Sequence, residues 1–180
     1  ERKMYARLLS SHPLLVKSAT SGVLTFSGDI ACQIFFQDEK YNPARTARFT
    51  FLGALLCGAP LHYWYGFLAQ KFPGQTLAAA TSRLAIDQLV FAPTFIPIFM
   101  SSVLLLEGKT RAEIENKVKS EYVGALKANY AVWIPAQFIN FYFVPVPFQV
   151  LMSNVTGLVW NTYFSFISYR EGEKSSVNKQ

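Results

Sequence analysis

Charged side chains are scarce in this sequence. Of its 180 residues, 16% are Asp, Glu, Lys or Arg, against about 25% in a typical soluble domain. Disorder is excluded, because disordered chains combine low hydrophobicity with high net charge, whereas 51% of these residues are apolar and 16% are aromatic. An ordinary soluble domain is also disfavoured, because the few charges are gathered into short segments and leave long segments with none.

Cysteine and the familiar catalytic motifs are equally scarce. The two cysteines, Cys32 and Cys57, lack metal-site spacing and exclude a disulfide framework. His12 and His62 have no partner at ligand spacing, and the sequence contains no nucleophile elbow, P-loop or dinucleotide fingerprint. We therefore predict no catalytic residue, no metal, no cofactor and no enzymatic activity. The net charge of +6 suits anionic lipid head groups, and without a basic cluster interleaved with aromatics nucleic acid is not an expected partner.

The sequence instead contains long uncharged segments. Crossing a hydrocarbon core of about 30 Å takes roughly 20 mostly apolar residues in a helix. Several windows meet this requirement, and one of them contains a single charge, Asp29. We predict an all-α, polytopic membrane helix bundle with about four transmembrane helices, at Lys17–Phe36, Phe49–Leu68, Leu84–Leu106 and about Phe148–Ile167. Four spans would place both termini in the same compartment.

The remaining segments have other expected roles. Residues 107–127 are rich in i, i+4 charge pairs and predict a helix outside the membrane, whereas Tyr130–Pro147 predicts an interfacial helix, or one bent into the bundle. Arg2–Ser18 is compatible with the end of a mitochondrial address or with an amphipathic surface helix. The domain prediction is one transmembrane domain over residues 1–170 and a polar tail over 171–180.

Polar side chains inside the uncharged segments are the candidate functional residues, because such groups are costly at membrane depth and usually face a bundle interior or a wet cavity. We expect Arg83 and Asp87 to pair on one helix face. Two interpretations are open: the polar groups line or gate a pore, or they hold the helices together by hydrogen bonds. The predicted pore-lining or gating residues are Asp29, Gln33, Arg83, Asp87, Gln137 and Asn140, and packing is favoured for Gln149, Asn154 and Asn161.

Small and aromatic residues indicate how the helices sit. Small residues recur at the four-residue spacing that lets helices approach closely, in the pairs Ser18 and Gly22, Ala54 and Gly58, and Ser153 and Gly157. Aromatic residues concentrate at membrane interfaces, so Tyr63, Trp64 and Tyr65 predict an interface belt at the end of the second span.

The order of these short motifs resembles the Mpv17/PMP22 family of mitochondrial and peroxisomal integral membrane proteins. The resemblance runs from about Tyr5 to Arg170, and its most specific part is the run from Trp133 to Pro145 followed by Trp160-Asn161-Thr162-Tyr163. Earlier pieces are Gly28-Asp29 with Gln33, Arg45-Thr46-Ala47-Arg48, Gly58-Ala59-Pro60, His62-Tyr63-Trp64-Tyr65 and Asp87-Gln88-Leu89. Gln149 stands where members usually have Arg, and Ile134 separates Trp133 from Pro135. These departures leave both the mitochondrial and the peroxisomal branch open.

The resemblance implies a four-span organellar protein, of the mitochondrial inner membrane or alternatively of the peroxisomal membrane. Two functions follow as hypotheses. The first is a channel or pore for small solutes or metabolites that supports mitochondrial homeostasis. The second is a non-catalytic accessory subunit of a larger inner-membrane respiratory complex. The expected partners are membrane lipids, a small solute, and either further copies of the chain or such a complex.

Overall fold

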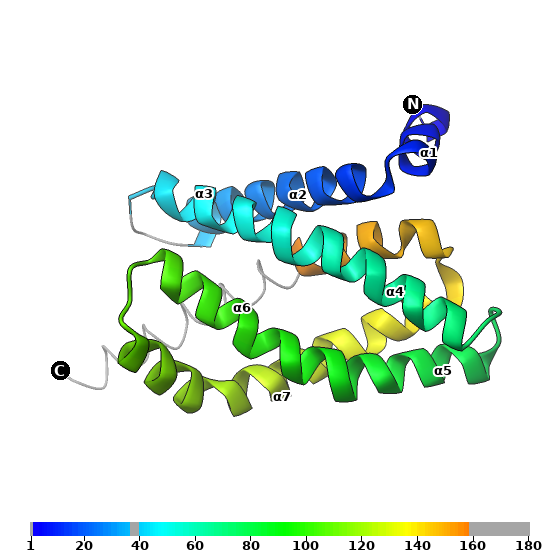
Figure 1. Ribbon diagram of the computed structural model, residues 1–180. Helices are drawn as coiled ribbons and strands as arrows, with labels where there is room; N and C mark the ends of the chain where they lie inside the picture. The colour runs from blue at the N-terminus through cyan, green and yellow to red at the C-terminus, as the bar shows by residue number, and fades with distance from the viewer. Residues whose placement is uncertain (1, 37–39, 159–180) are drawn as a thin grey trace.

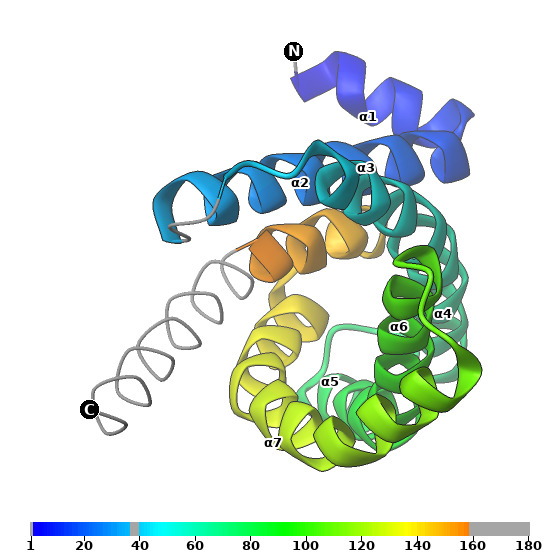
Figure 2. The same cartoon turned by 90° about the vertical axis from the view of Figure 1, so that its left-hand side faces the viewer.

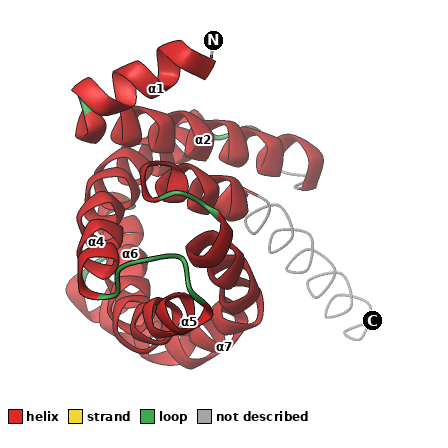
Figure 3. Ribbon diagram, turned by 90° about the vertical axis from the view of Figure 1, so that its right-hand side faces the viewer, coloured by secondary structure: helices red, strands yellow, loops and turns green. Residues whose placement is uncertain are grey.

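The computed structural model describes residues 2–36 and 40–158, and every regular element in these ranges is a helix (Figure 1, Figure 3). The predicted all-α class is therefore confirmed. The helices are α1 (Arg2–Ser11), α2 (Pro13–Phe36), α3 (Pro43–Leu52), η1 (Gly53–Gly58), α4 (Ala59–Lys71), α5 (Leu77–Ile86), η2 (Asp87–Phe91), α6 (Ala92–Leu106) and α7 (Arg111–Phe143). Residues 146–158 are also helical. The segments η1 and η2 are π-helical and each continues directly into the α-helices on either side, so residues 43–71 and 77–106 are two unbroken helices.

Local sequence signals set several helix ends. The side chain of Asn42 accepts the backbone N–H of Arg45 at 3.0 Å and Pro43 opens α3, both of which are favoured at a helix start. Thr110 and Glu113 form a reciprocal capping box at the start of α7. Gly108, just beyond α6, has a positive φ of 77°, a conformation that suits glycine at a helix C-terminus.

Successive passages of the chain run antiparallel along one bundle. The passages are α2, residues 43–71, residues 77–106, α7 and residues 146–158 (Figure 1). α2 packs on α3 and η1, and α7 packs on both α5 and α6. Seen along the bundle, α4, α5, α6, α7 and residues 146–158 form a ring that α2 and α3 close, with α1 outside it (Figure 2). Asn154 donates to the hydroxyl of Ser21 at 2.6 Å, which ties the last passage to α2.

Small residues let α2 approach η1 closely. A Cβ atom added to Gly58 would collide with the backbone of Ser18, and one added to Gly53 would collide with the side chain of Thr25. At Gly22 an added Cβ would stand 3.3 Å from that of Ala54. The two helices therefore approach more closely than larger residues would allow.

The four predicted spans are not all confirmed. Within the described ranges, one unbroken helix, Leu77–Leu106, is long and apolar enough to cross a membrane, and 6% of its apolar window is buried inside the molecule. It contains the third predicted span. The fourth predicted span extends beyond residue 158 and so lies partly outside the described residues, as does Asn161.

The predicted boundary between residues 107–127 and Tyr130–Pro147 is wrong. Both segments belong to α7, a single helix of 33 residues that ends before the extended Val144. The charged first half of α7 is not a detached helix, because the hydroxyl of Tyr122 donates to the carbonyl of Pro93 in α6 at 3.1 Å. The helix continues through the charged and the uncharged half, and Pro135 lies within it, although a proline removes one backbone hydrogen bond from a helix interior.

Burial is inverted relative to a soluble protein. Buried polar and charged side chains outnumber buried apolar ones among the described residues, whereas soluble interiors are mainly apolar. Large apolar side chains stand on the outside, among them Leu15, Phe35, Leu89 and Phe143, each at least 66% exposed. The site therefore has to be sought among the polar groups in the interior.

Candidate functional site

A buried carboxylate, Asp87, is the centre of the larger polar group in the bundle. Its side chain is 2% exposed. The indole Nε1 of Trp64 donates to its Oδ1 at 2.8 Å, and the amides of Gln88 and Gln137 donate to its Oδ2 at 2.8 and 3.0 Å. No cation pairs with Asp87 in the part of the chain that the structure describes. Its two oxygens are therefore satisfied by neutral hydrogen-bond donors.

The network continues from Gln137 to the hydroxyl groups of Tyr65 and Ser153. The Gln137 amide also donates to the hydroxyl of Tyr65 at 2.9 Å, and that hydroxyl lies 2.7 Å from the hydroxyl of Ser153. Asn140 donates to the Gln137 side chain at 2.9 Å and to Ser153 at 3.1 Å. We call this set the Asp87 cluster; its members are Trp64, Tyr65, Asp87, Gln88, Gln137, Asn140 and Ser153.

Four passages of the chain supply the Asp87 cluster. The π-helical segment η2 matters most, because Asp87 and the adjacent Gln88 are both buried there, at 2% and 5% exposure. Neighbouring residues of an α-helix point about 100° apart, and a π-helical turn alters that spacing, which is one reason why such turns recur at functional sites. Gln137 and Asn140 are three residues apart and so share one face of α7.

Arg83 does not pair with Asp87, so that predicted ion pair is wrong. Its guanidinium donates to the carbonyl of Phe72 at 2.6 and 3.1 Å and to the carbonyl of Gly74 at 2.8 Å. These carbonyls belong to the loop between α4 and α5. A planar guanidinium can satisfy several carbonyls at once, and this geometry turns Arg83 away from the carboxylate one turn later.

A second polar group surrounds Asp29 at the other end of the bundle. Arg45 Nε lies 3.0 Å from Asp29 Oδ1, while the hydroxyl of Thr46 and the amide of Gln33 donate to Oδ2 at 2.6 and 2.7 Å. Gln33 in turn accepts the backbone N–H of Asn42 at 2.7 Å. We call Asp29, Gln33, Asn42, Arg45 and Thr46 the Asp29 cluster. It joins the C-terminal part of α2 to the start of α3.

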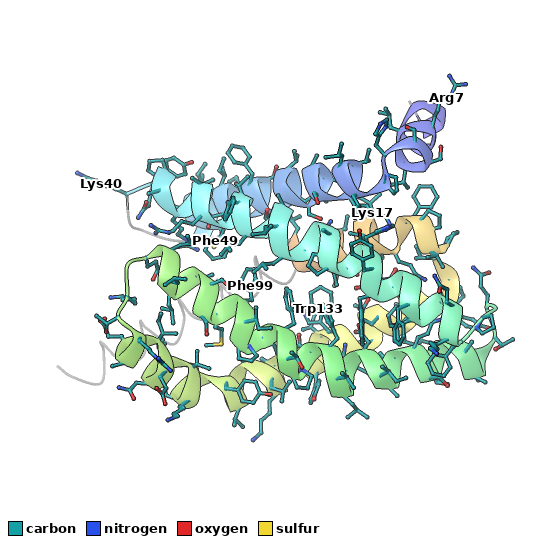
Figure 4. All side chains as sticks on the ribbon, viewed as in Figure 1. Arg7, Lys17, Lys40, Phe49, Phe99 and Trp133 are labelled. Atoms are coloured by element: carbon teal, nitrogen blue, oxygen red, sulfur yellow. The ribbon has the colours of Figure 1, made fainter. Side chains whose placement is uncertain are left out.

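A row of aromatic rings connects the two clusters. The rings of Phe67, Trp64, Phe91, Phe95, Phe99 and Phe49 follow one another, with successive centroids 5.1 to 6.4 Å apart. Trp64 belongs to the Asp87 cluster, and the guanidinium of Arg45 lies 5.6 Å from the Phe49 ring centroid. Phe49 and Phe99 project into the space between α3 and α6, and Trp133 lies further along the same interior (Figure 4). The space between the two polar clusters is thus occupied by a continuous row of aromatic rings.

The predicted site residues fall into three places. Asp87, Gln137 and Asn140 meet in the Asp87 cluster, Asp29 and Gln33 meet in the Asp29 cluster, and Arg83 holds a loop. Their role as pore-lining or gating residues stays a prediction. Gln149 and Asn154 both join passages: Gln149 donates to the carbonyl of Asn140 in α7 at 3.5 Å, and Asn154 donates to Ser21 in α2.

Sequence reasoning missed several members of the clusters. Arg45 and Thr46 stood out only as part of the motif Arg45-Thr46-Ala47-Arg48, although their place just before an uncharged segment was a signal that they could face Asp29. Trp64 and Tyr65 were assigned to an interface belt, which is wrong for Tyr65, 1% exposed, while Tyr63 is 63% exposed. Along a helix, adjacent aromatics point in different directions, so three in a row cannot all face the same surface.

One group in the Asp87 cluster is left without a partner. The side-chain oxygen of Asn140 is buried and accepts no hydrogen bond in the described structure. An unsatisfied buried acceptor costs roughly 1–3 kcal/mol. Among the described residues, no group of three or more His, Cys, Asp or Glu side chains is placed to hold a metal ion. The arrangement therefore offers hydrogen-bond donors and acceptors, and one carboxylate, to whatever enters it.

Comparisons with known proteins agree on one family. The model of the Mpv17/PMP22 family matches residues 104–165. Protein SYM1 of Yarrowia lipolytica is 38% identical over 175 residues, covering 96% of this chain and 83% of its own length. Peroxisomal membrane protein 2 of Bos taurus is 34% identical over 168 residues, covering 89% and 86%. The mitochondrial inner membrane protein Mpv17 of Danio rerio is 32% identical over 167 residues, covering 91% and 94%. No solved structure matches the chain significantly.

Proposed function

This chain belongs to the Mpv17/PMP22 family, and from that premise we propose that it is a multi-pass protein of the mitochondrial inner membrane that conducts small solutes. The alternative membrane is the peroxisomal one, because relatives of similar identity carry either name. Conduction requires no chemical step, so the proposal includes no enzymatic activity and no cofactor. Its expected partners are membrane lipids, a small solute and further copies of the chain.

The inverted burial supports insertion in a membrane. A bundle with apolar side chains outside and hydrogen-bonded polar side chains inside is stable where lipid replaces water. The helix Leu77–Leu106 is about 45 Å long at 1.5 Å per residue and exposes almost all of its apolar window. It exceeds a hydrocarbon core of about 30 Å, so it would cross with a tilt or extend beyond the core.

The number of crossings is part of the proposal. The sequence predicts four spans, but the second half of α7 packs on α5 and carries the buried Gln137 and Asn140. We propose that α7 is a fifth crossing in addition to the four predicted spans, with its charged first half at or beyond the membrane boundary. An odd number of crossings puts the termini on opposite sides. Tags at the two ends should then differ in protease access in intact organelles, whereas equal access would favour the four-span arrangement.

The single observation that carries the conduction proposal is the Asp87 cluster. It places a carboxylate, three amides and two hydroxyl groups in the interior of a ring of helices. Such groups can replace the hydration of a passing solute. These groups bond to one another and are nearly completely buried. We therefore interpret the arrangement as a closed conduit, in which Gln137 joins Asp87 to Tyr65.

Reconstitution tests the proposal. The purified chain in liposomes should release small solutes, and Gln137→Ala with Asn140→Ala should raise the release rate, because these amides close the interior. Asn154→Ala is the matched control: it also removes a buried amide, but one bonded to Ser21, and should leave the rate unchanged. A folded protein that releases nothing in either form would contradict conduction.

An accessory structural role is the second candidate. The observation that favours it is that the carboxylate of Asp29 has a complete set of partners, including an ion pair with Arg45, as expected for a group that only holds helices together. In this case the chain should migrate with a large inner-membrane complex on a native gel. Migration alone or as a small oligomer would favour the conduit.

A further inference from the structure

A buried lysine without a carboxylate belongs to neither polar cluster. Lys17 is 5% exposed, and its Nζ lies 2.9 Å from Nδ1 of His62 in α4. In the part of the chain that the structure describes, no carboxylate lies within ion-pair distance of it. Lys17 is near the start of α2, on the side of that helix that faces α4 (Figure 4). A buried ammonium is costly unless an anion compensates it.

Lys17 and His62 line a pocket of about 180 Å³. The other lining residues are Leu9 from α1, Pro13 from α2, Gly66 from α4, and Val146 with Pro147 from the start of the last passage. These other walls are aliphatic. The pocket therefore has a cationic end and an apolar remainder, and it exists only because the turn after α7 returns to α1 and α2.

The hydrogen bond between the two side chains fixes their roles. An ammonium carries three donors and no acceptor, so Lys17 donates and Nδ1 of His62 accepts. The imidazole is then neutral, with its proton on Nε2. In its ammonium form Lys17 has two further N–H donors. The positive charge of the pocket is one unit, and this limits what it can hold.

We infer that this pocket binds a small aliphatic monocarboxylate. Its carboxylate oxygens accept the two free N–H groups of Lys17, and its hydrocarbon chain lies against Leu9, Pro13, Val146 and Pro147. A dianion would bury a second, uncompensated negative charge. A cavity of roughly 150 Å³ holds a molecule the size of benzene, so 180 Å³ suits an acid of about four to six carbons. This inference goes beyond solute conduction and does not depend on it.

The test measures binding, not transport. The full chain, held in nanodiscs of neutral phosphatidylcholine, is titrated with butyrate and with butyramide, which has the same shape and no charge. We expect saturable binding of butyrate. Butyramide should bind at least about tenfold more weakly than butyrate, because a charge-assisted hydrogen bond is lost. Equal binding of the two compounds, or none of either, would overturn the inference.

Two variants locate the site. Lys17→Met keeps a long unbranched side chain and removes the charge, and it should weaken butyrate binding about tenfold or more. Lys71→Met, at an exposed position in the last turn of α4, is the matched control and should bind butyrate like the unchanged protein. Unchanged binding by Lys17→Met would overturn the assignment.

A measurement on the unchanged protein covers the case in which Lys17→Met does not fold. Butyrate, but not butyramide, should slow acylation of Lys17 by an amine-reactive reagent, read by mass spectrometry, while acylation of Lys71 continues. Lack of protection would refute the site. A last arm uses phosphatidylglycerol nanodiscs: protection of Lys17 by that lipid alone, with no effect of butyrate in neutral nanodiscs, would show a lipid head-group site and refute the monocarboxylate.

Discussion

Arg45 pairs with Asp29 across the contact between α2 and α3, with its Nε 3.0 Å from the carboxylate Oδ1. The carboxylate side chain is 3% exposed and the arginine side chain 28%. Asp29 is the one charge in its apolar window, and charges at membrane depth must be hydrated, paired or protonated. The structure shows that Asp29 is paired. The ion pair also fixes the start of the helix over residues 43–71 against the end of α2.

Removing the charge of Asp29 should destabilise the bundle. Asp29→Asn leaves Arg45 without its counter-ion and weakens the hydrogen bonds from Thr46 and Gln33, so we expect a loss of about 2 kcal/mol in the free energy of unfolding in detergent. Arg45→Gln together with Asp29→Asn should cost less than the sum of the single changes. Glu115→Gln, which breaks an exposed pair with Lys119, is the control and should change stability little. Strictly additive losses at Asp29 and Arg45 would contradict the pairing.

Arg83 and Asp87 should act independently. Arg83→Gln releases the carbonyls of Phe72 and Gly74. Asp87→Asn leaves one acceptor oxygen where Trp64 and Gln137 donate to two. Since the two side chains share no partner, their effects on the unfolding free energy should add within about 0.5 kcal/mol. Thermal or denaturant unfolding of the single and double variants measures this. A double variant that is more stable than Asp87→Asn alone would instead support an ion pair between Arg83 and Asp87.

Close packing at Gly58 should make it intolerant of a side chain. Gly58→Ala places a methyl group against the backbone of Ser18, so α2 and η1 must separate and we expect a loss of about 1–3 kcal/mol. Gly66→Ala is the matched change, because a Cβ there meets no atom within 4 Å. In a helix interior it should stabilise the protein by up to about 1 kcal/mol. Equal melting temperatures for the two variants would show that α2 does not approach η1 so closely.

The first turn of α7 should respond to pH. The side-chain and backbone donors of Thr110 lower the pKa of Glu113 below its ordinary value of 4.5. A carboxylate with a lowered folded-state pKa adds stability above the unfolded pKa and loses it as pH falls through the folded value. The protection factors of the amides at the start of α7, which compare their exchange rates with those of an unfolded chain at the same pH, should therefore fall below about pH 4. Glu113→Gln keeps an acceptor but does not titrate, and its exchange should show no such step; a step that persists in this variant would place its origin elsewhere.

Much of the fold was determined by local sequence. The uncharged segments predict the all-α class and the position of the third span, and the small-residue spacing indicates where helices can approach closely. These features depend on residues close together in the chain, or on a periodic face of one helix, so they can be recognised without knowing what lies opposite. The polar residues Asp87, Gln137 and Asn140 were also recognisable, because a polar group in an apolar segment needs partners wherever it is.

The partners themselves were decided by tertiary structure. Asp87 and Arg83 are one turn apart on a helix, and local spacing favours their pairing, yet Trp64 and Gln137 are separated from Asp87 by 23 and 50 residues and bind it instead. Likewise Lys17 and His62 are 45 residues apart, and nothing near either of them indicates a shared pocket. The sequence alone determined that polar groups such as Asp29, Asp87 and Gln137 must be satisfied inside the bundle. Which group satisfies which depends on how the π-helical turns and the continuous α7 rotate each helix face, and that rotation is set by packing between passages distant in the chain.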